Sequence, residues 1–277
     1  MRLIILALIF VVALVCESLW RLRETTESKR KRILRNLGLA CVSAIFVRFA
    51  FLPFEVWAAD FAARSKFGLL NSFPLTDLVR VALGFVLLEY TLYWWHYLNH
   101  RIAFLWRFHN VHHTDLDLDV STASRFHFGE LAFSSIFRVV QILLIGIDVR
   151  TFLLFETCVT AFAQFHHSNL RLPERLDSWL TGLIVTPRMH GIHHSIVRDE
   201  TDSNYGIIFT IWDRVHRSLK LGIPQDEIVI GVPSYRSFEE NSLAGLLFIP
   251  FRKQRRWELP NGVIPVRKQT SRGSGND

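Results

Sequence analysis

Several stretches of this chain are apolar enough, and long enough, to cross a lipid bilayer. About 20 apolar residues in a helix span the hydrocarbon of a membrane, and a backbone in hydrocarbon must satisfy its polar groups internally. The pattern therefore predicts an all-α integral membrane protein with four to five membrane segments. We expect them at residues 3–20, 34–54 and 78–98, with a shorter pair at 131–147 and 149–165 that forms a tight hairpin dipping into or spanning the bilayer.

The first apolar stretch has an alternative interpretation as a signal peptide. No small-x-small cleavage site follows it, and more apolar segments come later, so a retained membrane helix is favoured. Basic residues concentrate at 21–35 and again at 252–268, which is typical of cytoplasmic loops and tails. We therefore place residues 21–35 in the cytoplasm and the N-terminus outside. The same distribution disfavours a nucleic-acid surface, although the formal charge is +7.

All twelve histidines lie between residues 96 and 216, and ten of them form short clusters. Residues three and four apart share a helix face, so each cluster projects together. Neutral imidazole suits iron, zinc, copper and nickel, and this many ligands exceeds the needs of one ion. The predicted topology gathers the clusters at the cytoplasmic face, where a helical cap would hold two metals. The clustered residues are His96, His100, His109, His112, His113, His166, His167, His190, His193 and His194.

Motifs of several other metal and nucleotide sites are absent from the sequence. It has no H-E-x-x-H of the zinc proteases and no Glu-x-x-His pair of the soluble di-iron bundles. It has no thiolate set for structural zinc or an iron–sulfur cluster, and no Gly-rich phosphate loop. The histidine clusters therefore carry the chemistry.

Two carboxylates lie inside predicted membrane segments, where an ionised group normally needs a partner. Glu89 and Tyr93 share a stripe with His96 and His100, and Glu156 shares a face with His167. One hypothesis is that Glu89, Tyr93 and Glu156 orient ligand imidazoles. The alternative is that the two glutamates pair with arginines and serve structure alone; the candidates are Arg48, Arg80 and Arg138.

The ordered set of motifs resembles the fatty acid hydroxylase/sterol desaturase superfamily of membrane oxygenases, over roughly residues 80–216. The resemblance rests on His96-Tyr-Leu-Asn-His100-Arg, Leu105-Trp-Arg-Phe-His109-Asn-Val-His112-His113, Arg125-Phe-His127-Phe-Gly-Glu130, His166-His167-Ser-Asn, Pro187-Arg-Met-His190-Gly-Ile-His193-His194-Ser, Asp202-Ser-Asn-Tyr-Gly206 and Trp212-Asp-Arg214.

The resemblance implies a non-haem di-iron centre and O2-dependent oxidation of a lipid. Electrons would come from a separate donor, a cytochrome b5-like protein or a ferredoxin. Eight histidines match the family's three histidine boxes, and either His166 or His167 could be a further ligand, with His167 favoured. Together with the apolar and basic segments, it predicts a division into N-terminal membrane helices with a basic cytoplasmic loop (1–75), a catalytic domain (76–222) and a basic, partly disordered cytoplasmic extension (223–277).

The chain departs from the family pattern at two histidines. Phe128 stands where relatives usually have proline after the histidine, so His127 is either an outer ligand or a hydrogen-bonding support. His216 stands where relatives commonly place phenylalanine, and we interpret it as a surface residue.

Function follows from the resemblance as an expectation. We expect hydroxylation, with desaturation as the other outcome, of a lipid in a bacterial inner membrane. A metal-dependent lipid hydrolase and a metal transporter are the alternatives, and a purely structural membrane protein leaves the clusters without a purpose. A requirement for oxygen would distinguish an oxygenase from the hydrolase, and metal flux across a membrane would indicate the transporter.

Overall fold

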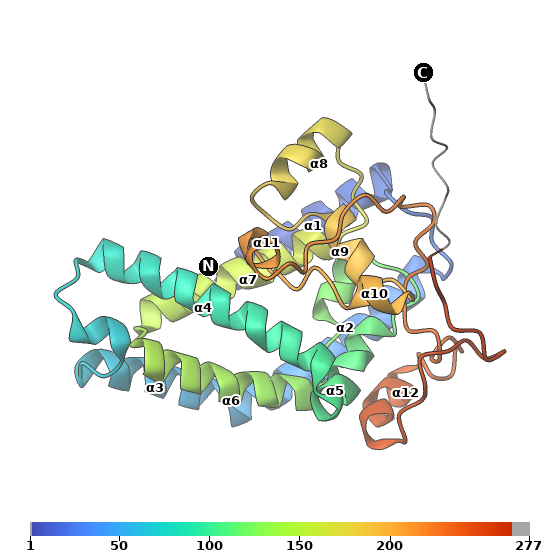
Figure 1. Cartoon of the computed structure of the whole chain (residues 1–277). Helices are drawn as coiled ribbons and strands as arrows, with labels where there is room; N and C mark the ends of the chain where they lie inside the picture. The colour runs from blue at the N-terminus through green and yellow to red at the C-terminus, as the bar shows by residue number, and fades with distance from the viewer. Residues whose placement is uncertain (1, 268–277) are drawn as a thin grey trace.

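The computed structural model describes residues 2–267, which form a bundle of long helices capped at one end by short helices and loops (Figure 1). The long helices are α1 (Arg2–Leu19), α2 (Lys29–Ala50), α3 (Leu52–Arg64), α4 (Asp77–Arg101), α6 (Phe128–Ile145) and α7 (Val149–His167). The short ones are α5 (Ala103–His113), α8 (Glu174–Thr181), α9 (Pro187–His193), α10 (Arg198–Thr201), α11 (Ile211–Val215) and α12 (Leu243–Phe248), with 3-10 turns at Leu69–Ser72, Val120–Ser124 and Ile249–Phe251.

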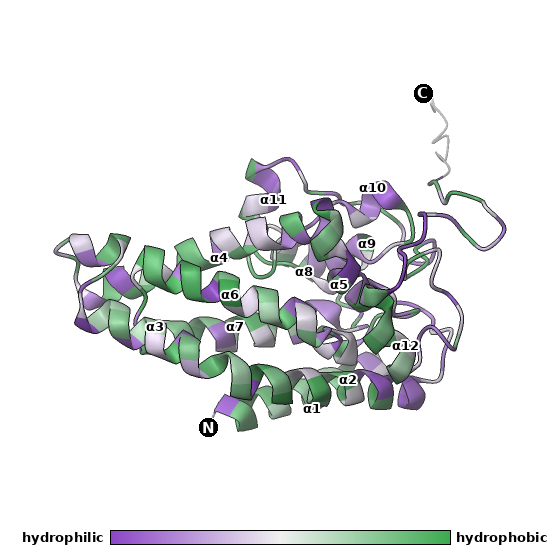
Figure 2. Ribbon diagram, turned by 90° about the horizontal axis from the view of Figure 1, so that it is seen from below, coloured by the Kyte–Doolittle hydropathy of each residue, from purple (hydrophilic) through white to green (hydrophobic). Residues whose placement is uncertain are grey.

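The predicted all-α membrane fold is confirmed. Between residues 2 and 267 the chain makes only isolated β-bridges and no strand. Four helices, α1, α2, α4 and α6, have the length and composition of membrane-spanning helices. Hydrophobic residues, drawn in green, predominate on the long helices, whereas hydrophilic residues, drawn in purple, are concentrated at the capped end (Figure 2). α7 is long enough to span but more polar, because it carries Glu156, Gln164 and two histidines.

The second predicted segment differs from the observed helices. Helix α2 begins at Lys29, so part of the expected basic loop is helical, consistent with the good helix propensity of lysine and arginine. The chain then bends at Phe51, and α3 continues from Leu52. Pro53 lies in the first turn of α3, where its missing N–H has no intrahelical partner to lose. Residues 34–54 are therefore parts of two helices.

The predicted hairpin break between α6 and α7 is confirmed at Gly146. Its φ of 86° is left-handed, which ends α6, and the side chain of Asp148 accepts a hydrogen bond from the Thr151 N–H at 2.7 Å to start α7. The backbone of Gly68 packs here so closely that a Cβ on Gly68 would lie 2.4 Å from the Gly146 nitrogen. The apolar core beside this turn draws on four long helices and includes Ala58, Ala59, Leu88, Ile142, Phe152 and Phe155.

A buried ion-pair network joins the start of α2 to the loop that follows α5. The guanidinium of Arg32 lies 2.9 Å from Asp115, 3.1 Å from Asp119 and 3.5 Å from Asp117, measured between nitrogen and oxygen. Burial alone raises the pKa of Asp115, but the charge of Arg32 outweighs this effect and holds the pKa well below its usual value.

The end of α1 joins the same region of the cap. The carboxylate of Glu17 accepts backbone N–H bonds from Val120 at 3.0 Å and from Asn169 at 2.8 Å. Asn169 follows the histidine pair at the end of α7, so three long helices meet at this end of the bundle. The predicted disorder at the extreme C-terminus concerns residues outside those that the structure describes.

Candidate metal centre

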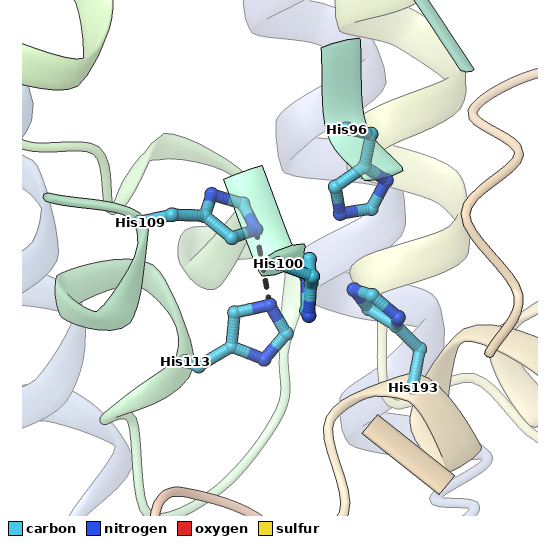
Figure 3. A group of neighbouring side chains, drawn as sticks. All are labelled: His96, His100, His109, His113 and His193. Carbon is cyan, nitrogen blue, oxygen red and sulfur yellow. Dashed lines mark hydrogen bonds between the residues drawn. The ribbon is translucent and has the colours of Figure 1, made fainter. Parts of the chain in front are cut away.

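The histidines converge from helices α4, α5, α7 and α9 at the capped end of the bundle. The first group comprises His96, His100, His109, His113 and His193, whose rings point toward a common centre (Figure 3). The second group comprises His112, His167, His190 and His194. Within each group one nitrogen of every imidazole lies within 4.8 Å of the others, and all nine residues are buried. The structure thus brings nine of the ten predicted ligands into two sets.

The two groups touch each other. The rings of His113 and His194 stack with centroids 4.4 Å apart, and each residue belongs to a different group. Neighbouring residues of one helix also divide between the groups: His112 and His113 on α5, and His193 and His194 at the end of α9. The H-x-x-H-H spacing therefore serves two adjacent sites at once.

Hydrogen bonds fix which ring nitrogen faces the centre. The Nδ1 atoms of His96, His193 and His167 lie 2.7–2.8 Å from the backbone carbonyl oxygens of Tyr205, Ser203 and Ala163. A carbonyl oxygen only accepts, so each Nδ1 carries the proton and each Nε2 keeps its lone pair. Metal-binding histidines are typically held in this way.

The donor set fits two cations. A metal bonded to imidazole nitrogens at about 2.1 Å holds opposite nitrogens about 4.2 Å apart, so groups within 4.8 Å need only a small contraction. Within the second group, the Nε2 of His167 lies 3.0 Å from the Nε2 atoms of both His112 and His190. Burial and the neighbouring imidazoles lower the pKa of His113, His190 and His194 well below its usual value, which favours the neutral form that binds metal.

The three remaining histidines lie outside both groups. His166 is buried beside the second group, with its ring centroid 4.1 Å from that of His190. His127 is a hydrogen-bonding support: its Nδ1 accepts the N–H of Gly129 at 2.9 Å, and its Nε2 lies 3.3 Å from the carbonyl oxygen of Leu247. His216, expected at the surface, is half-buried and stacks on Tyr93 at 5.1 Å between ring centroids.

The predicted stripe on α4 is present, but Glu89 does not take the role expected of it. Glu89 is fully buried, and its carboxylate accepts the backbone N–H groups of Ile208 and Phe209, both at 3.1 Å. Within residues 2–267, its hydrogen bonds go neither to an imidazole nor to an arginine. Every residue except proline carries a backbone N–H, so a side-chain pattern cannot predict this partner. The hydroxyl of Tyr93 bonds to Ser218 at 2.8 Å, so both residues brace residues 204–218 against α4.

Glu156 follows the structural alternative. Its carboxylate lies 3.0 Å from the guanidinium nitrogen of Arg138 on α6, and its hydrogen bonds reach no histidine within the described chain. The shared face with His167 is real, but the two residues are about 16 Å apart along the helix, at 1.5 Å per residue.

A third carboxylate, that of Glu130, contacts a histidine. Glu130, in the first turn of α6, accepts a hydrogen bond from Nδ1 of His109 at 2.7 Å, and both side chains are buried. This leaves the Nε2 of His109 facing His113 at 3.1 Å (Figure 3). The available signal was the position of Glu130, three residues after His127 in the same motif.

Replacing Glu130 by alanine is expected to lower the metal affinity of the centre by about 10- to 100-fold, because the imidazole of His109 loses the partner that orients it. Metal content after dialysis against graded chelator concentrations measures this. Glu130→Gln keeps an acceptor oxygen and should recover much of the loss. Glu156→Gln is the matched control and should retain metal like the unaltered chain. Equal losses of metal in Glu130→Ala and Glu156→Gln would refute the assignment.

A cavity of about 300 Å³ opens onto both groups between α4, α6 and α7. His96 and His109 of the first group and His112, His167 and His190 of the second line one wall. The other walls are mainly apolar and include Leu92, Phe126, Leu131, Val159 and Ala163. The cavity therefore offers mainly apolar space beside the imidazoles.

Comparisons with known proteins agree with this arrangement. Residues 81–218 match the fatty acid hydroxylase family. The chain is 30% identical over 201 residues to ornithine lipid hydroxylase OlsE of Rhizobium tropici, covering 72% of this chain and 59% of that protein. It is 26% identical over 182 residues to alkylglycerol monooxygenase of Danio rerio, covering 64% and 38%. It is 25% identical over 138 residues to human cholesterol 25-hydroxylase, covering 49% of each. The chain thus spans less than two thirds of each relative, and no solved structure matches it significantly.

Proposed function

Since the chain belongs to the fatty acid hydroxylase/sterol desaturase superfamily, we propose that it is a membrane-bound non-haem di-iron oxygenase that hydroxylates a C–H bond of a lipid with O2. The observation that carries this proposal is the pair of touching, fully buried imidazole groups beside an apolar cavity. The similar proteins are named for ornithine lipid, alkylglycerol and cholesterol, which supports a lipid substrate.

Each group of histidines would hold one iron. Imidazole is a common iron ligand, and the two irons would supply the one-electron redox chemistry that activates O2. We assign His96, His100, His109, His113 and His193 to one ion, and His112, His167, His190 and His194 to the other. His166 stays an additional candidate because both its ring nitrogens are buried without a hydrogen-bond partner among the described residues.

The protein's own residues position the reactants and exclude water. Glu130 and the backbone carbonyls of Ser203 and Tyr205 hold imidazoles in one orientation before substrate arrives. The apolar wall formed by Leu92, Leu131 and Val159 admits a lipid chain, and a water-poor site limits side reactions. Which carbon is oxidised depends on how far the chain enters.

The membrane orientation is part of the proposal. The basic residues of 21–35 lie at the same end of the bundle as the cap, which supports a cytoplasmic position for the centre under the positive-inside rule. Similarity to a bacterial lipid hydroxylase supports the inner membrane. The catalytic domain is proposed to span residues 76–222, in agreement with the family match. A cytochrome b5-like protein or a ferredoxin would supply electrons.

The proposed function is tested by oxygen dependence and metal content. Cells that express the chain should contain lipids heavier by one oxygen atom than cells without it, and ¹⁸O2 should label that atom. The purified protein should contain two irons per chain. A metal-dependent hydrolase would act equally well without oxygen, and a transporter would carry metal into proteoliposomes; either result, or the absence of iron, contradicts an oxygenase.

A further inference from the structure

Aromatic rings connect the first group of histidines to the protein surface. Trp106 on α5 lies 5.1 Å from the ring of His100 and 5.5 Å from that of His113, measured between centroids. Trp257, in the segment after α12, lies 5.8 Å from Trp106. Its indole N–H donates to the carbonyl oxygen of Ile196 at 2.8 Å, which fixes the ring in place. Two half-buried indoles thus form a continuous contact path from the metal centre outward.

A cation holds the two indoles together. The guanidinium carbon of Arg198 lies 5.4 Å from the ring centroid of Trp106 and 4.8 Å from that of Trp257. Cation–π contacts of this length are attractive. Asp202 orients Arg198 through an ion pair of 3.0 Å, so the path has a defined geometry.

The surface around the outer indole is basic and hollowed. Residues 252–256 read Arg-Lys-Gln-Arg-Arg, and all four basic side chains are exposed. A surface hollow of about 490 Å³ is lined by Lys253, Arg255 and Arg256, with Glu258 as its acidic member. Arg255 is paired with Glu240, whereas Arg252, Lys253 and Arg256 make no ion pair within residues 2–267. Gln254 accepts a hydrogen bond of 3.3 Å from Asn110, the neighbour of His109.

We propose that this surface is where a small one-electron carrier protein with an acidic face docks, and that Trp257 and Trp106 conduct its electron to the first group. The proposal rests on the proposed function. Each docking event would oxidise the carrier by one electron, which would pass to the metal ion that the first group would hold. Two such events, with two protons from solvent, balance the reduction of O2 in which one oxygen enters the lipid C–H bond and the other leaves as water.

Two features favour a protein partner over the anionic surface of a bilayer. The basic residues surround a hollow, which fits a convex partner, and the aromatic path leads inward from that place to the metal centre. Electrostatic complementarity raises the association rate of such transient complexes. Redox encounters of this kind use small interfaces, as expected for a segment of this size.

The binding test uses the full chain in neutral phosphatidylcholine nanodiscs, with a soluble acidic ferredoxin and a soluble cytochrome b5 domain as probes. The charge-reversal variant is Arg252→Glu/Lys253→Glu/Arg256→Glu. It is expected to raise the Kd of the tighter-binding probe by on the order of tenfold, because like charges then face each other. Raising the salt concentration should weaken binding of the probe to the unaltered chain by a similar factor. The matched control, Arg64→Glu/Lys66→Glu at the far end of α3, should bind like the unaltered chain (Figure 1).

Three results of this binding test would overturn the proposal. The first is that neither probe binds the unaltered chain. The second is an equal Kd for the charge-reversal variant and the control. The third is that charge reversal removes binding to vesicles of anionic lipid while leaving carrier binding intact, which would make the surface a membrane contact.

The path is tested by rapid mixing of the reduced carrier with the iron-loaded protein without O2. Trp106→Leu should keep the Kd and iron content but slow carrier oxidation severalfold, whereas Trp106→Phe, which retains a ring, should stay close to the unaltered rate. Dithionite reduces the centre without the carrier, so turnover driven by dithionite should fall less in Trp106→Leu than carrier oxidation does. Unchanged carrier oxidation in Trp106→Leu would refute conduction through this path.

The two proposals fail in distinguishable ways. If dithionite supports no oxygen insertion while the carrier still binds this surface in a salt-dependent way, the oxygenase proposal fails and docking stands. If dithionite supports oxygen insertion and charge reversal leaves carrier binding intact, docking at this surface fails alone.

Discussion

Replacing His193 by alanine is expected to abolish lipid oxidation and to reduce bound iron to one ion or fewer per chain. His193 is fully buried, its Nδ1 lies 2.7 Å from the carbonyl oxygen of Ser203, and its ring is 4.6 Å from that of His96. The variant removes a nitrogen from the centre of the first group and leaves a cavity that cannot replace it. Iron analysis of the purified protein and lipid mass spectrometry of the expressing cells measure the two effects.

The matched control is His216→Gln, which alters a half-buried histidine outside both groups. His216 stacks on Tyr93 at 5.1 Å, so this variant perturbs packing near α4 without removing a proposed ligand. It should retain two irons and most of the activity. Full activity in His193→Ala, or equal iron loss in both variants, would contradict the proposed ligand set.

Replacing Arg32 by methionine is expected to destabilise the protein by about 3–5 kcal/mol, the typical cost of removing one partner from a buried ion pair. Three buried carboxylates, Asp115, Asp117 and Asp119, would lose the cation that compensates them. The loop that contains these three aspartates directly follows His113. The positions of His109, His112 and His113 should therefore also become less well defined. Thermal unfolding in detergent, followed by helical circular dichroism, measures the loss.

Arg30→Met provides the comparison for that variant. Arg30 precedes Arg32 by two residues on the same helix and is exposed. Surface substitutions of this kind usually change stability by about 0.5 kcal/mol or less. Similar unfolding temperatures for the two variants would show that the network around Arg32 contributes little.

The membrane helices and the histidine-bearing helix faces could be predicted from the sequence, because both depend on the length and periodicity of local patterns. Apolar length identified the membrane helices, and residues three and four apart on a helix located the faces that carry His96, His100 and the two H-x-x-H-H runs. These features are local, because a helix fixes the relative direction of neighbouring side chains whatever surrounds it. The break at Gly146 was visible for the same reason, since a left-handed residue ends a helix locally.

The hydrogen-bond partners of the histidines and of Glu89 could not be predicted from the sequence, because they depend on tertiary contacts. The carboxylate that orients His109 is Glu130, which lies 21 positions away in the chain, whereas Glu89 bonds to backbone N–H groups about 120 positions away. The acceptors for His96 and His193 are carbonyl oxygens, which every residue type possesses. The bend at Phe51 was missed because the apolar pattern continues across it.

The cavity beside the two groups has a consequence for how the centre is filled. Five imidazoles from both groups form its wall, and every one of them is buried from the outer surface. Ions that enter or leave through this opening travel the path that a lipid chain would occupy. A long acyl chain bound there would block this path, so chelators should remove iron more slowly from lipid-saturated protein. For the same reason, a newly made polypeptide would need to bind its ions before its first lipid.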